Sequence, residues 1–246
     1  MNRSDIDPTV LAELAPTGTL RAGINLSNFL LVTDETATGD PIGVSPDMAA
    51  EIARRLGVGL TYVCYPDPGA LADAAERGEW DIGNIGAEPQ RAITIAFTAA
   101  YCEIESTYLV PANSPIHSLA EVDQPGHRIA TKGRAAYGLW LQNNLSHATL
   151  VCTDSIDTSF ETFVEQELDA LAGLRPRLIT DVERLPGARI LDGQFSAVQQ
   201  AIGTPRKNTV AAAWLAQVVE ELKSTGLVAD RIAKHQVDGL SVAPAA

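Results

Sequence analysis

The chain is predicted to have an α/β fold, because short apolar segments alternate along it with amphipathic helical patterns. The alternation runs strand–helix–strand in the first third of the sequence and starts again near residue 128, which predicts two α/β units. The 246 residues are 46% hydrophobic and 20% charged. This composition is typical of a globular chain that can bury a core without a metal or a disulfide.

The first unit has clear helix and strand signals. We expect helices over 9–15, 46–56 and 69–77, and strands over 20–24, 60–65 and 80–85, with a loop or hairpin tip over 33–41. Ser45 can cap the second helix, Pro46 suits its first turn and Gly57 can end it. A further helix is expected to open at Glu88-Pro89-Gln90-Arg91. The order of these segments predicts a largely parallel sheet.

The second unit repeats the pattern. We expect strands over 107–112, 128–131, 150–152 and 169–174, and helices over 134–144 and 155–166. A final helix is expected over 208–225. Ala211, Leu215, Val218 and Leu222 share one face of it, and Gly226 stops it.

The formal net charge of −13 argues against two classes of partner. Nucleic acids require a basic face, and anionic membranes attract basic segments. An anionic ligand would therefore have to be held by a few local arginines and backbone amides.

No motif for a metal, a nucleotide or a catalytic nucleophile is found. The three cysteines form no CxxC pair and are expected to be small buried hydrophobes, and the four histidines have no metal-ligand spacing. GxSxG, P-loop and GxGxxG motifs are absent. We therefore expect no cofactor, no metal and no catalytic residue.

The N-terminus is polar and acidic, without the basic start and apolar run of a secretory signal. No stretch approaches the ~20 apolar residues of a membrane helix. The sequence as it stands predicts a cytoplasmic protein, or a periplasmic one if a signal was removed. We expect a monomer that does not insert into a membrane.

Three stretches carry a resemblance to a known family. They are GTLRAGINLSNFLLV with GDPIGVSPDMAAEIARRLGV, then GEWDIGNIGAEPQRAITIAFTAAY, then HRIATKGRAAY with ELDALAGL. The second is the most specific, with an aspartate-led strand, a turn, a Thr-Pro-Glu-Arg-like helix start, Phe-Thr and a Tyr. From about Leu14 to Val237 the chain resembles extracellular solute-binding proteins, family 3, which serve polar amino-acid ABC transporters. The resemblance implies a type II periplasmic-binding-protein fold, which closes a cleft around one small ligand.

The resemblance also implies how the chain is divided. In this family the chain crosses between two lobes twice, here near 104–108 and 193–198. Lobe 1 would comprise residues 1–106 and 197–246, and lobe 2 would comprise 107–196. Each lobe would be a mixed, mostly parallel sheet flanked by helices, with a two-strand hinge between them.

By resemblance, Arg91 is the residue that grips the carboxylate of the ligand. A guanidinium presents two parallel donors to two carboxylate oxygens, which suits this role. The backbone amides of Gly86, Ala87 and Glu88 would lie at a helix N-terminus and add donors. The alternative is a surface arginine that pairs with Glu88.

The loop after the first strand would also line the cleft. It contains Asn25, Asn28 and Phe29. Aromatic residues at this place in the family often stack on the ligand. Phe29 could do so, or it could belong to the core.

In lobe 2 the resemblance points to Gly133, Arg134 and Ala135 at the start of a helix. A cation there opposes the helix dipole, and this broken rule is a hint of function. An anionic ligand held between the lobes would compensate it. The alternative is a solvated side chain that points away.

Two departures from the family affect the ligand. Asn25 stands where amino-acid binders often carry an acid, and Leu174, followed by Arg175, stands where an aspartate pairs with the ammonium group of the ligand. A buried ammonium without an acidic partner is costly. A carboxylate without an amino group, or a dicarboxylate, therefore fits the sequence better than a standard α-amino acid.

Three functions are consistent with this scaffold. The first is a binding protein for a small organic anion or amino-acid-like ligand, with an ABC permease as partner. The second is an enzyme similar to cyclohexadienyl dehydratase, for which Glu88, Glu103 and Lys132 are the candidate acids and bases. The third is a ligand-sensing module.

Overall fold

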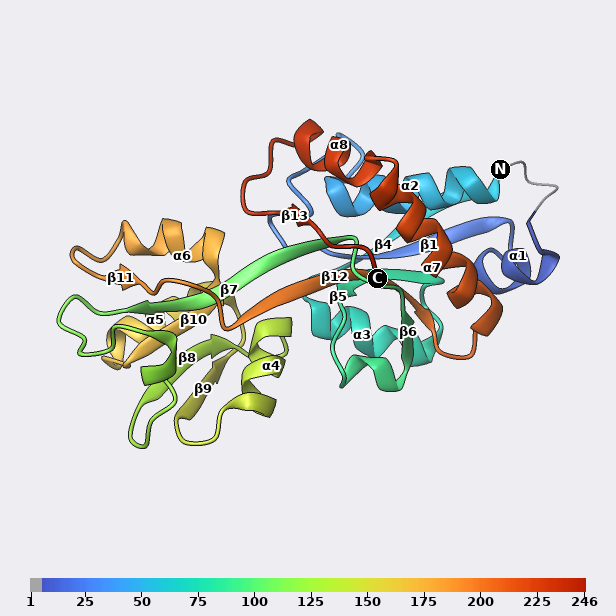
Figure 1. Ribbon diagram of the computed structural model, residues 1–246. Coiled ribbons are helices and arrows are strands. Elements are labelled where there is room, and N and C mark those ends of the chain that lie inside the picture. The colour runs from blue at the N-terminus through green and yellow to red at the C-terminus, as the bar shows by residue number, and fades with distance from the viewer. Residues whose placement is uncertain (1–5) are drawn as a thin grey trace. The chain divides into compact units, whose positions relative to one another are not determined.

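The computed structural model describes residues 6–246, which form two compact units (Figure 1). Unit 1 extends to Glu103 and resumes at Gln199, and unit 2 is Ile104–Val198. The chain passes from one unit to the other within two long strands, β7 (Cys102–Val110) and β12 (Ser196–Pro205).

Unit 1 is built on a mixed sheet. Its strands are β1 (Thr19–Asn25), β4 (Gly59–Tyr65), β5 (Ile82–Gly86), β6 (Ile95–Phe97) and β13 (Ser241–Val242), with the unit 1 parts of β7 and β12. β1 lies between β4 and β5 and is parallel to both. β12 is antiparallel to β5 and to β6, and β13 pairs with the start of β7. The predicted parallel order therefore holds for the strands near the N-terminus, and the returning chain adds the antiparallel strands.

Helices cover both faces of this sheet. They are α1 (Pro8–Leu14), α2 (Val44–Leu56), α3 (Pro68–Arg77), α7 (Thr209–Ser224) and α8 (Leu227–Lys234). One buried cluster joins α1, α2, α7 and α8 to β1. A second joins α3 to Trp80, Ile85 and Ile95. A short hairpin, β2 (Asp34–Glu35) with β3 (Pro41–Ile42), occupies the predicted turn-rich segment.

The ends of α2 test the predicted helix signals. Gly57 ends the helix in the left-handed conformation, as predicted. The predicted cap was wrong, because α2 begins at Val44 and Ser45 lies inside its first turn. The residue before the helix is Gly43, at φ 153°, where a Cβ atom would overlap the Leu31 carbonyl. Only glycine fits this entry to the helix, so it replaces a side-chain cap.

The strands of unit 2 also pair in both directions, and three α-helices accompany them. Its strands are β7, β8 (Arg128–Lys132), β9 (Thr149–Thr153), β10 (Ala170–Leu174) and β11 (Arg189–Ile190), and its helices are α4 (Ala136–Asn144), α5 (Ile156–Glu165) and α6 (Arg175–Val182). β8 is parallel to β9 and β10, and β7 is antiparallel to β10 and β11. Local sequence patterns predicted β8, β9, β10, α4 and α5 but neither α6 nor β11.

Candidate functional site

The turn after β5 carries Arg91. The Glu88 carbonyl accepts hydrogen bonds from the amides of Arg91 (3.0 Å) and Ala92 (2.9 Å). A single 3-10 turn, Arg91–Ile93, follows and leads into β6. The prediction of a helix opening at Glu88 was therefore wrong. The amides of Gly86, Ala87 and Glu88 do not lie at the start of an α-helix, and the Ala87 amide donates to the Gln199 carbonyl at 2.8 Å.

Arg91 is buried, with 5% of its surface exposed. Its Nη1 atom donates to the Gly86 carbonyl at 2.7 Å. The alternative of a surface arginine is therefore wrong. Burial of a guanidinium is costly unless its charge and its donors are satisfied. A buried arginine in this turn is suited to hold an anionic group.

Glu88 lies in the same turn as Arg91 and is partly buried. Burial raises the pKa of its carboxyl to about 7, and the opposing effect of the Arg91 charge is smaller. Glu88 therefore changes its charge near neutral pH. From the sequence, Glu88 is expected to be an ion-pair partner of Arg91 or an acid catalyst, and its burial depends on the fold.

The two asparagines after β1 shape their own loop. Asn25 Oδ1 accepts hydrogen bonds from the amide (3.1 Å) and the hydroxyl (2.9 Å) of Ser27. Asn28 Oδ1 accepts one from the Leu30 amide at 3.2 Å. These are local turns of the kind that asparagine favours. Both side chains therefore stabilise the loop, whether or not they also contact a ligand.

Phe29 is 40% exposed, and Leu26 in the same loop is also exposed. The alternative that Phe29 belongs to the core is therefore wrong. Exposure of two large apolar side chains in one loop is consistent with a surface that another group covers.

In unit 2, the turn after β8 places Arg134 differently from the prediction. Helix α4 begins at Ala136 with Ala135 as its N-cap, so Arg134 precedes the helix and does not lie in its first turn. Arg134 is exposed and has a φ of 60°, which is uncommon for a residue other than glycine. The Gly133 amide donates to the Thr153 carbonyl at 2.8 Å. Strained residues of this type cluster at functional sites.

Leu174 and Arg175 mark the boundary between β10 and α6. Leu174 is buried and serves as the N-cap residue of α6. Arg175 Nε donates to Glu105 Oε2 at 2.7 Å, and its Nη2 donates to the Gly193 carbonyl. Arg175 thus connects α6 with β7 and with the segment before β12, all within unit 2.

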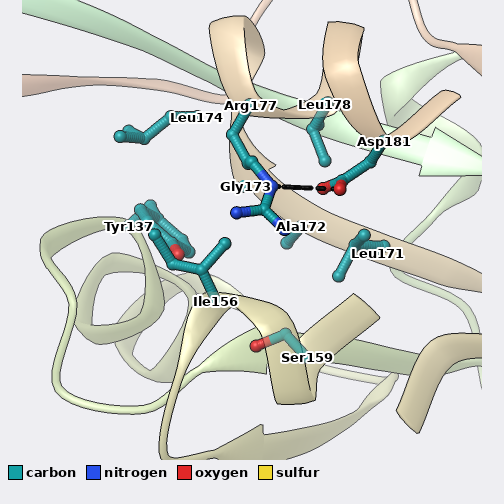
Figure 2. A pocket seen from close by; sticks show the side chains of 10 residues that line it. All are labelled: Tyr137, Ile156, Ser159, Leu171, Ala172, Gly173, Leu174, Arg177, Leu178 and Asp181. Carbon is teal, nitrogen blue, oxygen red and sulfur yellow. Dashed lines mark hydrogen bonds and ion pairs between the residues drawn. The ribbon is translucent and has the colours of Figure 1, made fainter. Parts of the chain in front are cut away.

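A small, mostly apolar cavity lies beside α6, with Arg177 and Asp181 in its wall (Figure 2). Arg177 Nε donates to both carboxylate oxygens of Asp181 at 3.0 Å, and its Nη2 donates to Asp157 at 2.6 Å. The cavity, which Tyr137 and Ser159 also line, has a volume of about 10 Å³. This is room for about one water molecule and not for an organic ligand. The cluster is therefore structural, and no sequence motif indicated it.

The structure also shows the surroundings of Glu103 and Lys132, the other two candidate acids and bases for an enzyme. Glu103 Oε1 accepts a hydrogen bond from Gln199 Nε2 at 2.9 Å, and Lys132 is buried at the end of β8.

Among residues 6–246, no group of three His, Cys, Asp or Glu side chains could hold a metal ion. In the same part of the chain, none of the helices combines the length and the apolar character needed to span a bilayer.

Comparison with known proteins gives one family and many structures of the same fold. A sequence model of the bacterial extracellular solute-binding proteins, family 3, matches residues 21–237. A mutant of ArgBP from T. maritima is 21% identical, with a TM-score of 0.71 over 92% of this chain and 99% of that one. A binding component of an ABC transporter from Wolinella succinogenes, complexed with lysine, is 18% identical, with a TM-score of 0.71 over 89% and 95%.

An ancestral amino acid-binding protein, AncCDT-1, described as a precursor of cyclohexadienyl dehydratase, is 19% identical, with a TM-score of 0.71 over 91% of this chain and 98% of that one. A search of curated proteins finds no match. At these identities the structures establish the fold, which is that of the type II periplasmic binding proteins.

Proposed function

Because this chain belongs to the bacterial extracellular solute-binding proteins, family 3, we propose that it captures a small carboxylate-bearing ligand for an ABC-type transporter. The ligand is either amino-acid-like or another organic anion. The observation that supports this most directly is the buried Arg91 in the turn after β5. The solved structures of similar fold include ArgBP in its arginine-bound form and a transporter component complexed with lysine.

Arg91 is proposed as the anchor for the carboxylate. The Gly86 carbonyl accepts from one end of the guanidinium and so fixes the direction of its planar group. A guanidinium fixed in this way can present two parallel donors to a carboxylate, and its burial strengthens these charge-assisted hydrogen bonds. Asn25, Asn28 and Phe29 are proposed to contribute the loop wall of the same site in unit 1.

Unit 2 is proposed to act as the second lobe. Its contribution would come from the turn Gly133–Ala135 and from Leu174 and Arg175, which follow β8 and β10. The strands β7 and β12, in which the chain passes from one unit to the other, would serve as the hinge. In this scheme the ligand binds the closed form better than the open form and shifts the population accordingly.

The test is a thermal-shift screen against amino acids, 2-oxo acids and dicarboxylates. A ligand at about 100 times its dissociation constant should stabilise the protein by about 2.7 kcal/mol. We expect Arg91→Lys to reduce the affinity at least about tenfold, because an ammonium cannot provide the paired donors of a guanidinium. Isothermal titration calorimetry measures this change.

The matched control is Arg77→Lys, which changes an exposed arginine on α3 of the same unit. It should bind the ligand as the native chain does. Circular dichroism would establish that both variants are folded. Unchanged affinity in a folded Arg91→Lys variant would remove Arg91 as the anchor.

An enzyme on the same scaffold is the second candidate, and the similarity to the dehydratase precursor AncCDT-1 favours its consideration. The partly buried Glu88, with a pKa of about 7, could act as an acid in such a reaction. Incubation with prephenate or arogenate distinguishes the two functions. An aromatic product that is lost in Glu88→Gln would identify an enzyme.

A further inference from the structure

Unit 2 contains a second cavity, which none of the residues proposed to hold the carboxylate ligand lines. Its volume of about 540 Å³ lies within the range of small-molecule sites, about 300–1,000 Å³. Three segments of unit 2 line it: the loop after β7 (111–113), the end of α5 with the turn that follows (163–168), and the turn before β11 (185–188). The cavity therefore has the size of a binding site in its own right.

The wall of this cavity is fixed by the protein itself. Each of the three segments is closed by one backbone hydrogen bond: the Ser114 amide to the Pro111 carbonyl (3.1 Å), the Glu167 amide to the Val164 carbonyl (3.3 Å) and the Ala188 amide to the Leu185 carbonyl (3.0 Å). Two of the segments are also in contact, because a Cβ atom at Gly187 would lie 3.0 Å from the Ala112 Cβ atom. Such a cavity is largely preformed, as small-molecule sites usually are.

The floor of the cavity is apolar, and its rim carries the polar groups. Phe163 and Leu168 belong to a buried cluster of unit 2 and form part of the lining. The lining residues with polar side chains are Asn113 and Glu167, and both are exposed. An apolar floor with a few polar groups at its edge suits a ligand that has an apolar body and one polar end.

The charge at the rim comes from Glu167. This residue has a φ of 49°, which is uncommon for a residue other than glycine, and Arg128 Nη2 donates to its backbone carbonyl at 3.2 Å. In the described part of the chain, the ion pairs of unit 2 join other acids, namely Glu105, Asp157 and Asp181. The Glu167 carboxylate is therefore available to a cation from outside the chain.

The neighbouring arginines of unit 2 do not supply that cation. Among the described residues, those that line the cavity include no arginine or lysine. Arg184 comes just before the third segment, and its guanidinium lies 4.0 Å from the centre of the Phe160 ring. Arg189 comes just after that segment and donates to the Ser114 carbonyl at 2.9 Å. The charge on the cavity wall is thus the negative charge of Glu167.

We propose that this cavity binds a small amphiphilic cation. The apolar body of the ligand covers Phe163 and Leu168 and leaves water, while its ammonium group pairs with the Glu167 carboxylate. A neutral molecule of the same shape lacks the ion pair and binds more weakly. The inference does not depend on the proposed function, because Arg91 and the other residues of that site take no part in it.

The test uses two probes that share one apolar body, 4-phenylbutylamine and 4-phenylbutanol. The first is a cation at pH 7 and the second is neutral. Isothermal titration calorimetry on the complete chain measures both affinities. We expect the amine to bind about fivefold more tightly than the alcohol, as one ion pair near the surface allows.

Three variants locate the binding. Glu167→Gln should abolish the preference for the amine, because it keeps the shape of the rim and removes its charge. The matched control is Glu161→Gln, which removes an exposed carboxylate of the same helix that does not line the cavity, and the preference should persist. Val164→Trp, at a lining position that is 41% exposed, should fill the cavity and weaken the binding of both probes at least about fivefold.

Circular dichroism establishes that each variant is folded. The inference is overturned if the amine does not bind, or if its affinity is unchanged in a folded Glu167→Gln or Val164→Trp variant. It is also overturned if the native chain self-associates in analytical ultracentrifugation and Val164→Trp makes it monomeric, because a second copy of the chain would then cover the cavity.

Discussion

Asp181 is a buried carboxylate whose charge Arg177 balances. Only 1% of its surface is exposed, and burial raises the pKa of its carboxyl in spite of the neighbouring guanidinium. Loss of one partner of a buried pair leaves the other charge without compensation. Removing one partner should therefore destabilise the fold by more than the intact pair stabilises it.

We expect Arg177→Met to lower the free energy of unfolding by about 3 kcal/mol, because Asp181 would stay buried without the guanidinium whose Nε donates to both of its oxygens. Urea denaturation followed by circular dichroism measures the change. The control is Arg184→Met, at an exposed arginine that lies 3.6 Å from the same carboxylate, where a loss below about 1 kcal/mol is expected. Equal losses in the two variants would contradict the prediction.

Arg91 and Arg134, the two arginines predicted to contact an anionic ligand, have different surroundings. Arg91 is buried in a turn that its own amide helps to close, and Arg134 is exposed in a left-handed conformation before α4. The resemblance to the family, together with the helix-dipole argument for Arg134, predicted anion binding for both. Their burial and backbone geometry could not be predicted, because each depends on how the following segment packs.

Helix α4 shows how an element is positioned by a single glycine. A Cβ atom at Gly138 would overlap the Lys132 carbonyl, so the first turns of α4 approach the end of β8 more closely than any other residue would allow. This approach sets the position of the turn Gly133–Ala135, which joins the strand to the helix. The geometry of a candidate binding turn thus depends on a residue outside it.

We expect Gly138→Ala to lower the free energy of unfolding by about 2 kcal/mol, because the added methyl group forces α4 away from β8. Urea denaturation measures this loss. Asn143→Ala, on the exposed part of the same helix, serves as the control and should change the stability by less than about 0.5 kcal/mol. An unchanged midpoint in Gly138→Ala would show that the helix has room to shift.

Element prediction succeeded where signals are local and failed where they are not. Gly57 ends α2 in the left-handed conformation, as the sequence indicated, and Gly78 ends α3 in the same way. No helix was predicted over Arg175–Val182, although proline is tolerated in the first turn of a helix. The segment after Glu88 was predicted as a helix, but pairing of β6 with β12 ends it after one 3-10 turn.

At the scale of the whole molecule, the chain returns to complete unit 1. Helix α8 packs near α2, where Lys234 Nζ and His235 Nε2 lie 2.7 and 3.1 Å from Asp47 Oδ2. Strand β13 pairs with the first residues of β7. Val228 and Ala243 are buried. The C-terminal segment is therefore part of the structure of unit 1.

A chain that ends at Thr225 should have a melting temperature lower by roughly 10 °C, because it loses the apolar contacts of α8 and the partners of Asp47. Thermal unfolding followed by circular dichroism measures the shift. A chain that ends at Pro244 removes only two exposed residues and should melt like the complete chain. The prediction fails if the two truncated chains melt together.

The sequence by itself determined the alternation of strands and helices, the C-terminal ends of α2 and α3, and the presence of an arginine in a family signature, because these depend on local periodicity and residue chemistry. Only the tertiary structure decided that Arg91 is buried and that Glu88 titrates near neutral pH. It also decided that Arg134 precedes its helix and that Arg175 pairs with Glu105. Burial and pairing arise from segments far apart in the chain, and no local pattern records them.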